Sequence, residues 1–136
     1  PFQPLFRAMG RVIHHLGGLG RGMTCKVLNN FVAASSVLAV RHALRGAADT
    51  GLAPEKLLEV MAVSSGGTWF GDNFDRISWA NERYDPGNTI GILEKDVNAM
   101  LAAVSGPEGD REPAAFAKAV RDALAVIPPS PLGGEN

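Results

Sequence analysis

The sequence has a single cysteine, Cys25, among its 136 residues. No internal disulfide can form, which fits a reducing compartment, and we expect the protein in the cytoplasm. Neither sign of charge is in excess either, because the sequence has 13 basic and 14 acidic side chains. Nucleic acid and anionic membrane surfaces are recognised through such an excess, so neither is an expected partner. No uninterrupted apolar run approaches the ~20 residues of a membrane span, and the first residues lack a signal pattern.

Strand-like segments are almost missing as well. Only Arg11 to Leu16 has this character, and a lone strand has nothing to pair with. Apolar residues elsewhere recur at spacings of three and four, which indicates helices. These spacings predict helices over 4–9, 22–48, 54–61, 89–104 and 113–126, with a short one between 68 and 79. The expected fold class is therefore all-α, in one domain large enough for a core.

The expected helix over 22–48 is the longest and contains no proline. Its middle, Phe31 to Val40, is apolar or small nearly all round, so we expect neighbours to enclose it on most sides. Pro54 stands where a helix favours proline, and Thr89 is the expected N-cap of the helix that follows. Ser105 to Glu112 reads as a loop. The long helix is thus predicted to form the centre of the domain.

The run Gly17-Gly18-Leu19-Gly20-Arg21-Gly22 leads into this helix as a glycine-rich turn. Gly22, Lys26 and Asn30 then recur at four-residue intervals on one face, and we expect Lys26 on the buried side. A dinucleotide-binding fingerprint would need its third glycine at position 23, which is Met23, and a second strand after the helix. Both requirements fail. Spacing alone leaves two interpretations open, a sharp corner without function or the start of a chemical site.

Three blocks in order resemble one family. The run Gly17-x-x-Gly20-x-Gly22-x-x-x-Lys26-x-x-Asn29-Asn30 is similar to the signature opening the C-terminal helical domain of the β-hydroxyacid dehydrogenases, the 3-hydroxyisobutyrate dehydrogenase family. Residues 93–102, with Glu94-Lys95-Asp96, look like the family's Lys-Asp helix, and 65–69 resemble its Ser-Gly-x-x-Trp loop. The resemblance covers about residues 3–104. Asn29 argues against the related 6-phosphogluconate dehydrogenases, which carry histidine there.

This resemblance implies a domain organisation. Residues 17–127 would form a helical domain of the 6-phosphogluconate dehydrogenase C-terminal type. Residues 1–16 would be the remnant helix and strand of a missing Rossmann domain that binds most of an NAD or NADP cofactor, and 128–136 a flexible tail. The implied substrate is a small β-hydroxyacid or its semialdehyde, and the implied assembly a homodimer or higher homo-oligomer. The chain alone is then expected to be inactive.

The resemblance also assigns the catalytic residues. Lys26 would be the acid–base group of hydride transfer, pointing into a cleft shared with the missing domain. An unperturbed lysine has a pKa of about 10.4, so oxidation at neutral pH needs burial or a nearby cation. Asn30 resembles the amide that orients the substrate. From the residues alone, Lys26 can equally be a surface lysine and Asn30 a helix-packing amide.

Further contacts follow from the same likeness. Asn29, Trp69 and Gly22 would lie against the substrate, and Lys95 would reach the cofactor near its nicotinamide. The alternatives are a core position for Trp69 and a solvated charge cluster for Lys95. Asp96 is expected to position Lys95 or neighbouring backbone.

The two histidines before the glycine-rich turn and the long apolar stretch remain to be interpreted. His14 and His15 read as structural, with no metal expected, because no third ligand lies nearby in sequence. A second class of function is a non-catalytic helical dimerisation module or a decayed fragment. Its support is the long apolar stretch 31–40, which calls for more partners than the chain readily supplies.

Overall fold

The computed structural model describes residues 2–104 and 112–133, and all regular elements in these ranges are helical. The predicted all-α class is confirmed. The elements are α1 (Gln3–Met9), α2 (Arg21–Asp49), α3 (Pro54–Ala62), α4 (Trp69–Asp72), the 3-10 helix η1 (Phe74–Arg76), α5 (Thr89–Val104) and α6 (Glu112–Leu124). The expected helices agree closely with these bounds, except that the one between 68 and 79 divides into α4 and η1. The loop expected between α5 and α6 lies outside the described residues.

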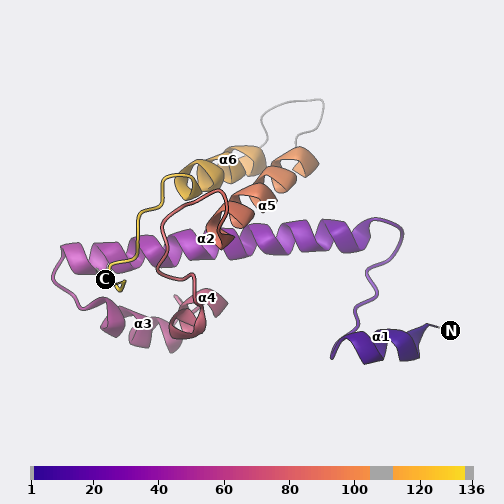
Figure 1. The fold of residues 1–136 in the computed structure, drawn as a ribbon, viewed down its shortest axis with the longest axis horizontal. Helices are drawn as coiled ribbons and strands as arrows, with labels where there is room; N and C mark the ends of the chain where they lie inside the picture. The colour runs from indigo at the N-terminus through magenta and orange to yellow at the C-terminus, as the bar shows by residue number, and fades with distance from the viewer. Residues whose placement is uncertain (1, 105–111, 134–136) are drawn as a thin grey trace.

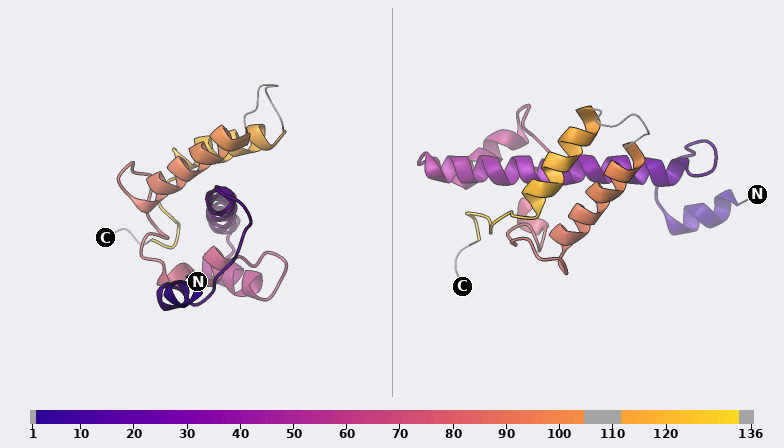
Figure 2. Two further views of the ribbon diagram at one scale, coloured as in Figure 1. Left: turned by 90° about the vertical axis from the view of Figure 1, so that its right-hand side faces the viewer. Right: turned by 90° about the horizontal axis from the view of Figure 1, so that it is seen from above.

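Helix α2 is the element around which the others are arranged (Figure 1). Its 29 residues span about 43 Å. Helices α5 and α6 lie on one side of α2, and α3 and α4 lie on the other (Figures 1 and 2). Viewed from its end, α2 is therefore the middle of three layers. Helix α1 lies apart from this arrangement, and all of its residues are exposed.

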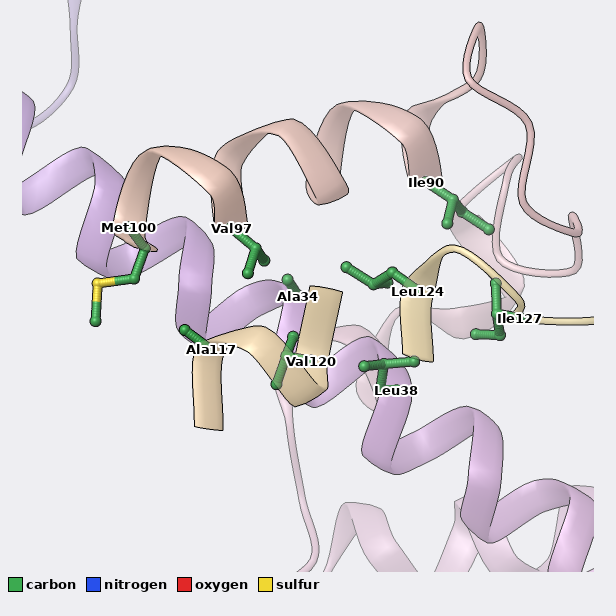
Figure 3. Packing of buried hydrophobic residues seen from close by; sticks show 9 residues of the cluster. All are labelled: Ala34, Leu38, Ile90, Val97, Met100, Ala117, Val120, Leu124 and Ile127. Atoms are coloured by element: carbon green, nitrogen blue, oxygen red, sulfur yellow. The ribbon is translucent and has the colours of Figure 1, made fainter. Parts of the chain in front are cut away.

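Two clusters of buried side chains meet on α2. The first fills the space between α2, α5 and α6 (Figure 3) and consists of Ala34, Leu38, Ile90, Val97, Met100, Ala117, Val120, Leu124 and Ile127. The second lies between α2 and the α3–α4 side and consists of Val37, Val40, Leu44, Phe70, Phe74 and Ala80. Each large side chain among them contributes roughly 1.5–3 kcal/mol. The layered arrangement thus rests on the two faces of one helix.

Burial along α2 begins only at Ala34. The residues from Arg21 to Lys26 are all exposed, so this first part of α2 projects beyond its neighbours, whereas Val27 and Phe31 pack partly against the first cluster. The expectation that 31–40 is enclosed on most sides is also wrong in part. Val32 is 65% exposed and Ala39 is exposed, because the neighbouring helices cover two faces of α2 and leave the faces between them open.

By length and composition α2 could also cross a membrane. Core helices of folded domains share this length and composition. Here the two clusters account for the apolar residues that α2 turns towards α3, α4, α5 and α6.

The strand predicted over 11–16 does not form. This segment carries no regular structure and makes no hydrogen bond to a neighbouring strand. A strand is stabilised by its ladder to a partner, and the described residues contain no strand that could provide one. The assignment of 1–16 to a nucleotide-binding domain stays a prediction.

The segment 128–133, expected to be a flexible tail, is packed against the helices instead. Ser130 is only 3% exposed, and its N–H donates to the carbonyl oxygen of Asn81 at 3.1 Å. The side chain of Leu132 packs against the second cluster. Its proline and glycine content predicted a flexible tail. The structure instead shows that hydrogen bonds to distant parts of the chain hold this segment in place.

Arg41 ties this segment to α2. The residue is 4% exposed, and its guanidinium donates to the carbonyl oxygens of Ala80 (2.6 Å), Glu82 (3.1 Å) and Pro128. Burial, with a smaller effect from the charge of Arg45, lowers the pKa of Arg41 to about 10. The group is therefore still protonated at neutral pH and keeps its donors. Backbone carbonyls satisfy the buried cation in place of a carboxylate.

Helix α5 is fixed at its start by Asn88. The side-chain oxygen of Asn88 accepts hydrogen bonds from the N–H groups of Ile90 (3.0 Å) and Gly91 (3.2 Å). The cap is thus Asn88 rather than the expected Thr89. A Cβ atom on Gly91 would lie 2.5 Å from the carbonyl oxygen of Asp85, so this position requires glycine.

Candidate functional site

The glycine-rich turn leads into α2 as predicted. Gly17 and Gly20 have φ values of 95° and 86°, in the left-handed region that favours glycine. Gly20 is the N-cap of α2, and its carbonyl oxygen accepts from the N–H of Thr24 at 3.0 Å. The helix then carries Lys26 one turn after Gly22, which lies exposed in the first turn. The predicted helical backbone around the lysine is confirmed.

Lys26 itself is exposed, so the expectation that it lies on the buried side of α2 is wrong for this chain. It belongs to the exposed first part of α2, before the residues that pack against the first cluster. Within residues 2–104 and 112–133 no carboxylate pairs with its ammonium. The group is consequently open to a ligand or to another protein surface.

Asn30, one turn further along α2, is held by Asp96 of α5. Its Nδ2 donates to Oδ2 of Asp96 at 2.8 Å, and both side chains are half-buried. A carboxylate only accepts hydrogen bonds, so the amide must turn its NH₂ group towards Asp96. Its oxygen is then left to accept from Lys26 or from a substrate hydroxyl.

The partner of Asp96 is thus an amide on α2, and not Lys95 or neighbouring backbone as the sequence suggested. The sequence contains a signal for this pairing. Asp96 lies three residues after Leu93 and four before Met100, on the inward stripe of α5. A charged residue on such a stripe indicates a polar partner on the facing helix.

Lys95 is exposed, beside Asp96 in sequence. Lys26 lies four residues before Asn30 on α2, and Lys95 lies one residue before Asp96 on α5. Each lysine is therefore within about one helical turn of the Asn30–Asp96 hydrogen bond along its own helix. The fold brings together residues from two of the three blocks that carry the family resemblance.

A groove of about 470 Å³ opens beside this pair. It is lined by Asn29, Val32, Ala33, Ser36, Val37, Gly67, Thr68, Trp69, Phe70, Trp79 and Leu93. Two predicted substrate contacts, Asn29 and Trp69, are brought together on its walls although they are distant in sequence. Gly22 does not line it. The groove thus adds residues of the third block to the site.

A tight turn positions this wall of the groove. A Cβ atom on Gly67 would lie 3.0 Å from the carbonyl oxygen of Met61, which leaves little room for a side chain. Thr68 then caps α4 by accepting from the N–H of Gly71 at 3.0 Å. The turn directs Phe70 into the core (2% exposed) and leaves Trp69 69% exposed. Trp69 is therefore not the core residue that the alternative interpretation expected.

The remaining candidates lie outside this site. His14 and His15 are exposed, and the described residues contain no group of three His, Cys, Asp or Glu side chains arranged to hold a metal ion. Cys25 is also exposed.

Comparison with known proteins establishes the family. Residues 20–125 match the family described as NAD-binding of NADP-dependent 3-hydroxyisobutyrate dehydrogenase. This range contains Lys26, Asn30, Trp69, Lys95 and the facing Asp96. The chain belongs to this family of NAD(P)-dependent hydroxyacid dehydrogenases.

Individual relatives agree with this assignment. An NAD-dependent L-serine dehydrogenase of Pseudomonas aeruginosa is 42% identical over 120 residues, which cover 79% of this chain and 40% of that protein. A 3-hydroxyisobutyrate dehydrogenase of the same organism is 32% identical, over 74% of this chain and 36% of its own. A probable mitochondrial 3-hydroxyisobutyrate dehydrogenase of Arabidopsis thaliana is 31% identical, over 82% and 33%. The chain thus spans a third to two fifths of the length of these relatives. No solved structure matches it significantly.

Proposed function

We propose that this chain is the C-terminal catalytic and substrate-binding half of an NAD(P)-dependent oxidoreductase that interconverts a β-hydroxyacid and its semialdehyde. The observation that carries the proposal is the Asn30–Asp96 hydrogen bond beside Lys26. It orients an amide next to a free ammonium, at the edge of a groove of substrate size. The three blocks of the family resemblance supply these groups from distant parts of the chain.

Lys26 is the proposed acid–base group. As ammonium it gives a proton to the oxygen of the semialdehyde during reduction, and as free amine it takes the hydroxyl proton during oxidation. Asn30, oriented by Asp96, accepts a hydrogen bond from Lys26 or from the substrate hydroxyl. Asn29, Trp69 and Gly22 are the proposed substrate contacts.

The fit of the cofactor to this chain is partial. The described residues contain no sheet, and so no strand–turn–helix cradle for dinucleotide phosphates. They do offer the exposed Lys95 beside the Asn30–Asp96 pair, where a nicotinamide would approach the reacting carbon. When bound, the cofactor supplies the hydride acceptor or donor. We assign contact with the nicotinamide end to Lys95, and the phosphates to a Rossmann domain outside this chain.

Substitution of Lys26 tests the proposal, in an enzyme that carries this domain together with a nucleotide-binding half. Lys26→Ala should lower kcat for β-hydroxyacid oxidation by about 10²–10⁴-fold, the usual contribution of a general acid–base. Lys118→Ala, at an exposed position of α6, is the matched control and should leave turnover unchanged. Equal turnover in the two variants would remove the lysine from the mechanism.

A homodimer or higher homo-oligomer is the assembly that we propose. Its support is the set of exposed apolar side chains at the start of α2 and just before it, namely Leu19, Met23 and Leu28. The same surface favours the second candidate, a dimerisation module without catalytic function. The Lys26→Ala experiment separates the two, because a module without catalysis has no turnover to lose.

A further inference from the structure

The walls of the groove beside Asn30 are mostly apolar and carry no ionisable side chain. Seven of the lining residues are Val32, Ala33, Val37, Trp69, Phe70, Trp79 and Leu93. The hydroxyl of Ser36 donates to the carbonyl oxygen of Ala33 at 2.8 Å, and that of Thr68 accepts from the N–H of Gly71. The proton of Ser36 and the oxygen of Thr68 are thus already engaged within the fold, and Asn29 is the other polar side chain on the walls. A charged substituent would find no counter-charge there, whereas an apolar one would displace water from apolar walls.

The groove also exceeds what a three-carbon hydroxy acid fills. Its volume of about 470 Å³ is many times the roughly 10–15 Å³ that holds one water molecule. Three of its lining residues are aromatic. The rings of Phe70 and Trp79 stack, with 5.5 Å between their centroids and an interplanar angle of 25°. Aromatic walls favour a planar or bulky apolar group.

Its place on α2 relates the groove to the proposed chemistry. Asn29 and Ala33 follow Lys26 by three and seven residues, about 4.5 Å and 10.5 Å along the helix axis. All three lie towards the same side of the helix. A substrate whose oxygen meets Lys26 and Asn30 therefore extends a substituent along α2 towards Ala33 and Val37.

We infer that the groove holds an apolar substituent of the substrate, and that the substrate is a β-hydroxyacid with an aryl or branched alkyl group on the carbon between carboxylate and hydroxymethyl. This inference rests on the proposed function and names its substrate class. Ala33 is then a specificity-determining residue, because its small side chain leaves the length of the groove open.

The two tryptophans of the protein allow a direct test on this chain, since Trp69 and Trp79 both line the groove. Titration with 3-hydroxy-2-phenylpropanoate should give a saturable change in tryptophan fluorescence. The unsubstituted 3-hydroxypropanoate should bind at least about tenfold more weakly, since it leaves the apolar walls uncovered. Equal affinity of the two acids, or no saturable change with either, overturns the inference.

Variants locate the binding. Ala33→Leu fills the groove and should weaken the phenyl acid by about tenfold or more. Ala39→Leu makes the same change at an exposed position of α2 outside the groove and should leave affinity within about twofold. If Ala33→Leu does not fold, Ser36→Leu narrows the same groove one turn away. Unchanged affinity in the folded groove variant contradicts the inference.

The outcomes remain distinct from those of the proposed function. Lys26→Ala should lower turnover by about 10²–10⁴-fold in the enzyme that carries both halves, while the phenyl acid still changes the fluorescence of this chain. Turnover of 3-hydroxypropanoate without preference for the phenyl acid would sink the substrate class and leave the dehydrogenase function standing. Binding of the phenyl acid with turnover insensitive to Lys26→Ala would leave the groove assignment standing and remove Lys26 from the mechanism.

Discussion

The amide of Asn30 donates to the carboxylate of Asp96 at 2.8 Å, across 66 residues of sequence. This contact joins α2 to α5 at the point where the buried cluster between them begins. It fixes the orientation of the amide and leaves the oxygen of Asn30 able to accept a hydrogen bond. The orientation needed for chemistry at Lys26 is therefore set within this domain, before any other domain or ligand takes part.

The coupling between these two residues can be measured by a double-mutant cycle. Asn30→Ala and Asp96→Ala should each destabilise the fold, and their effects should be non-additive by about 0.5–3 kcal/mol, because each removes the same half-buried bond. Urea denaturation gives the free energies of unfolding. Asn98→Ala, at an exposed position of α5, is the control and should change little. Simple additivity would show that the two side chains do not interact in solution.

Two glycines in helices should respond to alanine with opposite signs. A Cβ atom on Gly91 meets the carbonyl oxygens of Asp85 at 2.5 Å and Pro86 at 2.8 Å, so Gly91→Ala should destabilise by about 1–3 kcal/mol. Gly46 of α2 has no neighbour within 4 Å of such an atom, and Gly46→Ala should stabilise by up to about 1 kcal/mol. Thermal denaturation of both variants is the measurement. A stabilising Gly91→Ala would mean that α5 does not start against the 85–86 turn.

Arg41 should be far more important for stability than its neighbour on the next turn. Arg41→Met leaves the carbonyls of Ala80, Glu82 and Pro128 without their charged donor, and we expect a loss of about 3 kcal/mol or more. Arg45 is exposed and donates only to the carbonyl oxygen of Pro129, at 3.1 Å, so Arg45→Met should cost less than about 1 kcal/mol. Comparable losses of unfolding free energy in urea denaturation would show that Arg41 does not hold these three carbonyls.

Tyr84 provides a test by pH, since it is the only tyrosine in the chain. Its hydroxyl donates to the Glu94 carboxylate at 2.8 Å. This bond raises the pKa of Tyr84 above the ordinary 10.0, with smaller effects from burial and from the charges of Glu94 and Asp85. The ultraviolet titration of tyrosinate should therefore have a higher midpoint in the folded protein than in urea, and Glu94→Ala should bring it down.

The sign of the stability effect follows from that shift. The folded-state pKa lies above the unfolded value, so the stabilisation is complete below pH 10 and is lost as the pH rises through the folded pKa. The difference in unfolding free energy between the wild type and Tyr84→Phe should shrink over that window. A constant difference would indicate that the bond to Glu94 does not control the titration.

The sequence by itself determined the helices and the family. Spacings of three and four residues are local properties, and they located α2, α3, α5 and α6 because a helix closes its hydrogen bonds within a few residues. Glycine and lysine at fixed offsets carried the family resemblance in the same local way. The comparisons confirm that reading.

Only the tertiary structure decided the rest. The exposure of Lys26 depends on where the neighbouring layers end along α2. The pairing of Asn30 with Asp96, the meeting of Asn29 with Trp69 and the docking of Ser130 depend on how distant elements cross. Such contacts have no period in the sequence, because they arise from the packing of two clusters on two faces of one helix. The strand predicted for 11–16 fails for a related reason, since a strand exists only with a partner.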